Sequence, residues 1–182
     1  MGILFSKKEY NEETCNLLSH NETFGRQIET NTEEIKQINT VDCILSSNVL
    51  NHTDDINAVL EKVNEIMSPQ GVLVFEVPYL YDLVEQVASD TIYHEHLRSL
   101  SVSSIVNLFS QYRLSVVKVQ QTLRYGGNIR VLVHKGEHDS IDGSVEEFLQ
   151  REKDLGFFRQ ETYNKFRENT ISTKMDLLEL LI

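Results

Sequence analysis

Four consecutive side chains near the middle of the chain could do acid–base chemistry: Tyr93, His94, Glu95 and His96. An imidazole titrates near neutrality, so either histidine can accept and return a proton at physiological pH. The run lies in an irregular stretch, Ser89 to Leu100, between two segments with helical spacing. Loops held by a rigid scaffold often carry catalytic residues, so this run is the first candidate site. A surface loop that holds two histidines by chance is the plainer alternative.

Two predicted strands deliver further polar side chains. The short apolar runs Val41–Leu45 and Val72–Val77 are typical of strands buried on both faces of a parallel sheet. The carboxyl ends of such strands share one edge, where open α/β sheets bind ligands, so polar groups that follow them should meet. These groups are Asn48 and His52 after the first run, and Glu76 and Tyr79 at the end of the second.

A metal hydrolase built on His52, His94 and His96 is a third possibility, of a different class. Zinc proteases use His-Glu-x-x-His because this spacing puts both imidazoles on one helical face, whereas a single residue separates His94 from His96. We therefore predict no metal. The two cysteines, Cys15 and Cys43, form no Cys-x-x-Cys pair, so we expect buried thiols rather than a disulfide or a zinc knuckle.

Composition excludes some classes of function. The formal net charge of -11 argues against a general nucleic-acid binder, which needs clustered lysines and arginines. No apolar run reaches the roughly 18 residues of a membrane span, and no signal-peptide pattern opens the chain, so we expect a cytoplasmic protein. Local arginines such as Arg98, Arg124 and Arg130 could still hold a phosphate group.

The elements that must position these groups follow from periodicity. The spacing of Ile56, Val59, Leu60 and Val63 predicts a helix capped by Asp54 or Thr53. The expected elements of the remaining chain are a modest helix at Asn11–Ser19, a turn at Ser68–Gly71, helices at Leu80–Val87 and Val102–Phe109, and antiparallel strands at Leu114–Leu123 and Ile129–His134. Together they predict an α/β fold: part of a Rossmann-like, mostly parallel sheet with an antiparallel edge strand, followed by a helical tail.

The tail differs in composition from the rest of the chain. We place a boundary at residue 136, with a partial sheet domain over residues 1–136 and a helical extension over residues 137–182. The extension should form two helices, Val145–Leu155 and Phe157–Ile182. The second ends on Leu177, Leu178, Leu180, Leu181 and Ile182. We expect this apolar end to contact a further domain or a second copy of the chain.

Four segments, taken in order, resemble one family. They are Asn48-Val49-Leu50-Asn51-His52 with Asp54-Asp55, Phe75-Glu76-Val77-Pro78-Tyr79, Asp90-Thr91-Ile92-Tyr93-His94-Glu95-His96, and Gly126-Gly127-Asn128-Ile129-Arg130. Together they are similar to the class I C-methyltransferases that use S-adenosyl-L-methionine (SAM) to methylate nucleotide-linked deoxysugars. The similarity extends over roughly Tyr10 to Lys135, and it implies SAM as cofactor and a nucleotide-linked keto-sugar as substrate.

The resemblance also implies roles for residues. A base removes the proton beside the ketone, and the enolate carbon then takes the methyl group. His96 would be the base, oriented by Glu95 or a neighbouring group, and Tyr93 would share this role. His52 and Tyr93 would lie near the ketone oxygen. The residues expected to bind substrate are Asn48, Glu76, Tyr79, His94, Gly126, Gly127 and Arg130.

Two of these assignments have plainer readings, and the chain also departs from the family pattern. Gly126 and Gly127 equally fit an ordinary turn, and Arg130 equally fits a solvated strand face. The family's glycine-rich SAM loop, its cysteine-rich zinc module and its C-terminal domain are not found in these 182 residues. Asn51, Ser99 and Asn128 stand where the family favours alanine, an aromatic residue and serine. A non-catalytic binding or assembly module is therefore the alternative function.

Overall fold

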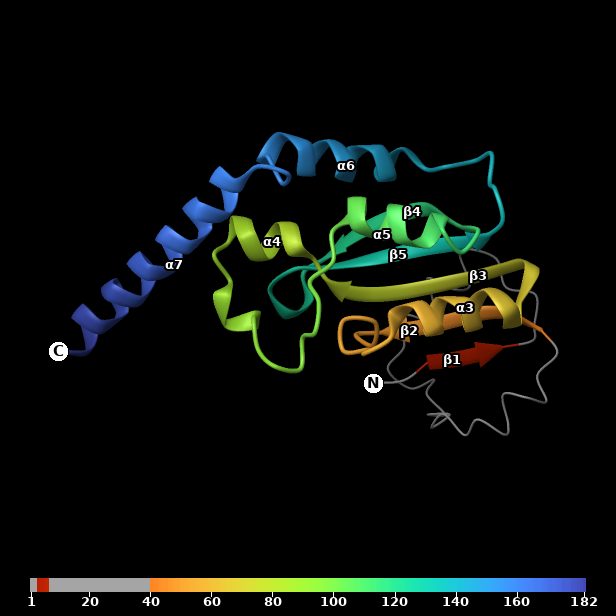
Figure 1. Ribbon diagram of the computed structural model, residues 1–182, viewed down its shortest axis with the longest axis horizontal. Helices are drawn as coiled ribbons and strands as arrows, with labels where there is room; N and C mark the ends of the chain where they lie inside the picture. Colours follow the sequence, from red (N-terminus) through yellow and green to blue (C-terminus); the bar gives the residue numbers. More distant parts are fainter. Residues whose placement is uncertain (1–2, 7–39) are drawn as a thin grey trace.

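The computed structural model describes residues 3–6 and 40–182 (Figure 1). The predicted helix at Asn11–Ser19 and the thiol of Cys15 lie outside these residues. The described part contains one five-stranded sheet in the order β1-β2-β3-β5-β4. Its strands are β1 (Ile3–Ser6), β2 (Val41–Ser47), β3 (Met67–Pro78), β4 (Leu114–Thr122) and β5 (Asn128–Lys135).

The strand directions confirm an α/β fold with a mixed sheet. β2 and β3 pair in parallel, whereas β5 runs antiparallel to both β3 and β4. β4 therefore points the same way as β2 and β3. β1, at one edge of the sheet, runs antiparallel to β2, whereas the reversed strand of the predicted hairpin, β5, was expected at the edge but lies inside the sheet, between β3 and β4. The short connection through η2 (Arg124–Gly126) makes β4 and β5 a hairpin, and β5 then takes the free side of β3.

β3 begins earlier than its sequence predicts. Val41 pairs with Met67 and Cys43 with Val72, so the segment at residues 68–71 bulges within the strand instead of separating it from the preceding helix. Bonds from outside the turn hold the bulge in place. The Ser68 hydroxyl donates to Asp42 Oδ1 at 2.7 Å, and Lys135 Nζ donates to the Met67 carbonyl at 2.8 Å. Tertiary contacts here override the turn signal.

The helix between β2 and β3 forms as predicted, with its cap one residue later. α3 spans Ile56–Ile66, and its N-cap is Asp55, whose carboxylate accepts from the Ala58 amide at 3.0 Å. The sequence favoured Asp54 or Thr53, but the Thr53 hydroxyl donates to the Val49 carbonyl at 2.9 Å. The apolar face of α3 is buried against the sheet.

Three helices cover one face of the sheet: α3, α5 (Val102–Ser110) and α6 (Gly143–Leu155) (Figure 1). Their apolar side chains form the main core with those of β3 and β5 that point the same way, because alternate residues of a strand face opposite sides. A smaller apolar cluster lies on the other face, and it contains the thiol-bearing Cys43, which is 2% exposed. The burial predicted for this cysteine is confirmed.

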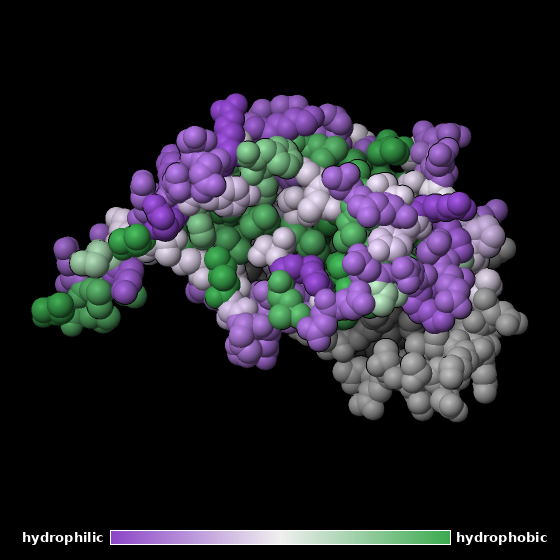
Figure 2. All heavy atoms as spheres, in the orientation of Figure 1, coloured by the Kyte–Doolittle hydropathy of each residue, from purple (hydrophilic) through white to green (hydrophobic). Residues whose placement is uncertain are grey.

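The tail consists of α6 and α7 (Gln160–Leu181), close to the two helices predicted. α7 extends away from the body of the molecule (Figure 1), and apolar side chains gather at its far end (Figure 2). Leu180 and Leu181 there are 84% and 74% exposed. Within residues 3–6 and 40–182, no helix combines the length and the apolar character that crossing a bilayer requires.

Candidate active site

The turn after β2 presents His52. Asn48 has a φ of 51°, a left-handed conformation that asparagine tolerates better than most residues, and its amide donates to the Glu76 carbonyl at 2.8 Å. The Val49 carbonyl then accepts from the His52 amide at 3.0 Å. The chain thus leaves the strand in a tight, hydrogen-bonded turn with His52 at its end.

Tyr93 and His96 face each other across a second turn, in which the His96 amide donates to the Tyr93 carbonyl at 3.0 Å. The Tyr93 hydroxyl lies 2.9 Å from His96 Nε2, and the ring centroids are 4.2 Å apart. His96 Nδ1 lies 2.8 Å from the Thr91 carbonyl, which can only accept. Nδ1 therefore carries the proton, and in the neutral ring Nε2 accepts from the Tyr93 hydroxyl.

His52 joins this pair. Its Nδ1 lies 2.7 Å from the Glu95 carbonyl, and its ring centroid lies 4.8 Å from that of His96, in an edge-to-face arrangement. The predicted convergence of His52, Tyr93 and His96 is confirmed. By the same reasoning the neutral His52 ring carries its proton on Nδ1 and offers Nε2 as an acceptor. That atom is buried, and the described part of the chain supplies no partner for it.

Arg98 ties the two turns together. Its guanidinium donates to backbone carbonyls of the His52 turn: those of Leu50 at 3.3 Å, Asp54 at 3.0 Å, and Thr53. The sequence suggested a phosphate ligand at Arg98, but the structure commits this side chain to the backbone. Neither the hydrogen bonds of Arg98 to this turn nor the hydrogen bond between His96 and the Thr91 carbonyl was predicted, because every residue has a backbone carbonyl and the residue type does not show which carbonyl accepts.

The other two members of the Tyr93–His96 run point outward. The side chains of His94 and Glu95 are 89% and 63% exposed, and His94 Nε2 lies 4.0 Å from Glu95 Oε1. Glu95 acts at the site through its backbone carbonyl. The neighbouring group that orients His96 is the Thr91 carbonyl, so the Glu95 carboxylate does not fill that predicted role in this structure.

Glu76 and Arg130 form a buried ion pair. Arg130 Nε donates to Glu76 Oε1 at 2.8 Å, its terminal nitrogen donates to the same oxygen, and both side chains are 7% exposed. The two residues are direct neighbours in the β3–β5 register. Arg130 is therefore neither a solvated residue nor an available phosphate ligand, and the carboxylate of Glu76 is engaged inside the protein rather than open to a substrate.

Tyr79 belongs to the core. It is 1% exposed, its ring stacks on Tyr81 with centroids 5.5 Å apart, and its hydroxyl donates to Glu152 Oε1 at 3.0 Å. Burial, with the nearby Glu152 carboxylate, raises the pKa of Tyr79 above its ordinary value. The structure gives this residue a packing role in place of the predicted contact with substrate.

The Gly126–Gly127 loop lies beside the β2 turn. Asn128 Nδ2 donates to Asn48 Oδ1 at 3.1 Å, which joins residues far apart in sequence. Gly127 has a φ of 131°, and a Cβ there would lie 2.4 Å from Asp82 Oδ2. Both oxygens of Asp82 accept from Gln121 Nε2 at 2.8 Å, and burial raises the pKa of this carboxyl. The glycine is thus required by the loop geometry.

The described residues do not supply a complete site for a nucleotide-like cofactor. The turn that follows β2 has no glycine, and Arg98 occupies carbonyls of that turn. No group of three or more histidine, cysteine, aspartate or glutamate side chains in this part of the protein could hold a metal ion. The arrangement suits proton transfer at Tyr93 and His96, with His52 alongside.

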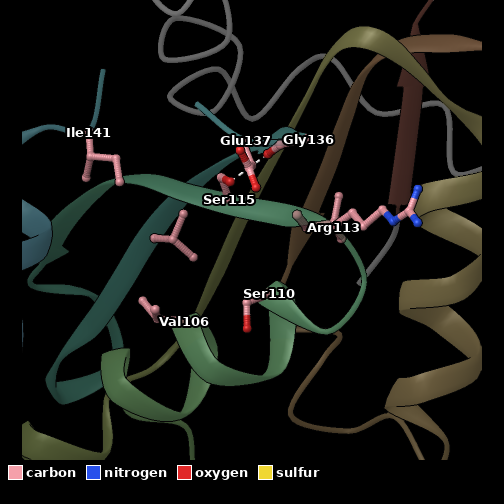
Figure 3. A pocket seen from close by; sticks show the side chains of 9 residues that line it. Val106, Ser110, Arg113, Ser115, Gly136, Glu137 and Ile141 are labelled. Carbon is pink, nitrogen blue, oxygen red and sulfur yellow. Dashed lines mark hydrogen bonds between the residues drawn. The ribbon is translucent and has the colours of Figure 1, made fainter. Parts of the chain in front are cut away.

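A separate cavity of about 410 Å³ lies where β5 ends and β4 begins, lined in part by Arg113, Ser115, Gly136 and Glu137 (Figure 3). The Ser115 hydroxyl donates to the Gly136 carbonyl at 2.6 Å, and the Gly136 amide donates to the Arg113 carbonyl at 2.8 Å. The cavity includes none of His52, Tyr93 and His96. It is not part of the candidate site.

Residues 7–119 match the family described as a methyltransferase domain, and residues 124–182 match the C-methyltransferase C-terminal domain. The expectation that this C-terminal domain is missing from the 182 residues was therefore wrong. The chain is 34% identical over 131 residues to the C-methyltransferase NovU of Streptomyces niveus, an alignment that covers 71% of this chain and 31% of NovU. The chain thus spans less than a third of the length of this curated relative.

Solved structures resemble the chain more distantly. The 1,6-didemethyltoxoflavin-N1-methyltransferase of Burkholderia thailandensis is 17% identical, with a TM-score of 0.48 and coverage of 71% of this chain and 59% of that one. A putative type 11 methyltransferase from Sulfolobus solfataricus is 16% identical, with a TM-score of 0.45 and coverage of 75% and 73%.

Proposed function

Because the chain belongs to the methyltransferase domain family, we propose that it serves in the transfer of a methyl group from SAM to a carbon of a nucleotide-linked keto-deoxysugar. The match of residues 124–182 to the C-methyltransferase C-terminal domain and the identity with NovU support carbon as the methylated atom. One observation carries the proposal: the Tyr93 hydroxyl lies 2.9 Å from His96 Nε2 while the Thr91 carbonyl fixes the proton on Nδ1.

The pair can generate an enolate. Tyr93 Oη takes the proton from the carbon beside the ketone while the Tyr93 proton passes to His96 Nε2; the electron pair of the broken C–H bond forms the C=C bond of the enolate, and the π pair of the C=O bond moves to the ketone oxygen. The Thr91 carbonyl stabilises the imidazolium that results. Tyr93 is 43% exposed, so an acceptor can reach its ring. A positioned base of this kind contributes about 10²–10⁴-fold to rate.

His52 is suited to the charge on the enolate oxygen. In the neutral ring its Nε2 accepts, and this atom is buried, so His52 acts on the ketone oxygen through the charge of its imidazolium form and not through a direct hydrogen bond. The Glu95 carbonyl at Nδ1 stabilises that charged form. His52 thus supports the developing oxyanion when it is protonated, and Tyr93 with His96 acts as the base.

The cofactor would supply the electrophilic methyl group. Since the described residues do not form a complete site for SAM, we assign them the activation of the acceptor and not the holding of the cofactor. Phosphate recognition on the acceptor is open to Arg124, which is exposed, whereas Arg98 and Arg130 are engaged elsewhere.

Acceptor activation can be tested without the cofactor. The chain is incubated in D2O with a nucleotide-linked keto-deoxysugar, and deuterium uptake beside the ketone is followed by NMR. We expect uptake above the buffer rate, at least about 100-fold slower with His96→Gln and with Tyr93→Phe, and unchanged with His138→Gln, an exposed histidine outside the site. Equal uptake by wild-type and His96→Gln protein would contradict the proposal.

A binding or assembly module is the second candidate. The exposed apolar end of α7 favours it, as does the lack of a complete SAM site among the described residues. Calorimetric titration with SAM separates the two candidates. Micromolar affinity supports the enzyme, whereas absence of heat together with absence of deuterium uptake supports the module.

A further inference from the structure

Glu152 of α6 is a fully buried carboxylate, with 0% exposure. Four donors surround it. Oε1 accepts from the Tyr79 hydroxyl at 3.0 Å and from the Val102 amide at 2.6 Å, while Oε2 accepts from the Ser103 amide at 3.0 Å and from the Ser103 hydroxyl. A buried carboxylate is costly unless it is fully hydrogen-bonded, so this arrangement fixes all four groups in space.

The two amides are the first two of α5. The third amide of α5, that of Ser104, also has no carbonyl partner within the helix, and it donates to the Ser101 hydroxyl at 3.1 Å. An intrahelical cap and a carboxylate from another helix therefore satisfy the start of α5 together. The negative charge also lies at the positive end of the helix dipole. Glu152 and the Ser101 cap thus fix the start of α5 together.

The start of α5 is also the end of the segment that carries the candidate site. Leu100 pairs with Tyr79 in an isolated bridge, and its carbonyl accepts from the Leu80 amide at 3.0 Å. Glu152 accepts hydrogen bonds from Tyr79, which is the bridge partner of Leu100, and from Val102, which follows Leu100 by two residues. His96 lies a few residues before this fixed point.

We propose that Glu152 is a positioning residue for the Tyr93–His96 pair, an inference that rests on the proposed function of that pair. The carboxylate fixes the carboxyl end of the Ser89–Leu100 segment, and Arg98 fixes the part of the segment that follows the pair. Glu152 lies in the part that matches the C-terminal domain family, whereas Tyr79 and Val102 lie in the part that matches the methyltransferase domain. The site thus depends on both parts of the chain.

Glu152→Gln tests the charge with almost no change in volume. The amide nitrogen replaces one oxygen, so the amide of either Val102 or Ser103 faces a donor, and a backbone N–H cannot reverse its role. Hydrogen exchange of Val102–Ser104 should become roughly tenfold faster. The ¹⁵N shifts of the His96 ring should move away from the pure Nδ1–H tautomer. Glu147→Gln, an exposed acid on the same helix, should change neither property.

Each outcome decides the inference. Faster exchange at Val102–Ser104 with an unchanged His96 ring would mean that Glu152 only caps α5, and unchanged exchange would overturn the inference altogether. If Glu152→Gln does not fold, Tyr79→Phe replaces it, because this variant keeps the carboxylate and removes only one of its donors. Tyr79→Phe must then shift the same His96 signals, although less strongly, and the absence of any shift overturns the inference. Because these readouts need no substrate, a chain that shows the shifts but takes up no deuterium would refute the proposed function alone.

Discussion

Replacing Arg130 by methionine should destabilise the protein strongly. Arg130 Nε lies 2.8 Å from Glu76 Oε1, and both side chains are 7% exposed, so the change leaves the Glu76 carboxylate buried without its ion-pair partner. Removing one member of a buried pair costs about 3–5 kcal/mol. That is a large part of the roughly 5–15 kcal/mol by which a domain is stable, so urea unfolding should show a lower midpoint with a similar slope.

A double variant tests whether Glu76 and Arg130 stabilise the fold as a pair or through separate, additive contributions. Glu76→Met/Arg130→Met removes both charges, and we expect it to recover most of the stability lost in Arg130→Met, because apolar side chains often replace a buried pair without loss. Arg124→Met, an exposed arginine just before β5, should change stability by less than about 0.5 kcal/mol. A cost below about 1 kcal/mol for Arg130→Met, or additive effects of the two single variants, would refute this reasoning.

Three further outcomes are expected. Gly127→Ala should lower the thermal midpoint clearly more than Gly126→Ala, since both have positive φ but only Gly127 faces Asp82; equal shifts would contradict this. Burial raises the pKa of Asp82 above its ordinary value of 3.8, so the contribution of this carboxyl to folding stability is full below pH 3.8 and declines as pH rises through the higher pKa of the folded state. The stability of Asp82→Asn relative to wild type, measured by urea titration, should therefore increase from pH 4 to pH 7. A difference that stays constant over this range would refute the prediction. If α7 joins two copies, light scattering should show a dimer that Leu181→Asp converts to a monomer, and a monomeric wild type would exclude self-association.

Periodicity was enough to predict most of the helices and strands after residue 40. It failed at residues 68–71, where Ser68 and Lys135 hold a turn-like sequence inside β3 through contacts with distant partners. It also could not place β5 inside the sheet, because strand order depends on which edge is free rather than on any local pattern. In both cases the structure is determined by contacts with residues far away in the sequence, which a local pattern cannot show.

The candidate site was predicted in part. The family resemblance implied that His52, Tyr93 and His96 share one site, and the three side chains lie together in the structure. Residue type misled for Glu76 and Arg130, since a charged pair on neighbouring strands resembles a ligand site until its burial is known. The group that orients His96 is a backbone carbonyl, and any residue at position 91 could provide it.

The backbone anchoring of both imidazoles has a consequence for how this site can vary. The carbonyls of Thr91 and Glu95 hold the two rings, so exchanging either side chain leaves the acceptor in place. The insertion or deletion of a single residue between positions 91 and 96 would instead move both carbonyls off their rings at once. The site should therefore tolerate changes of residue identity there while remaining intolerant of changes in loop length.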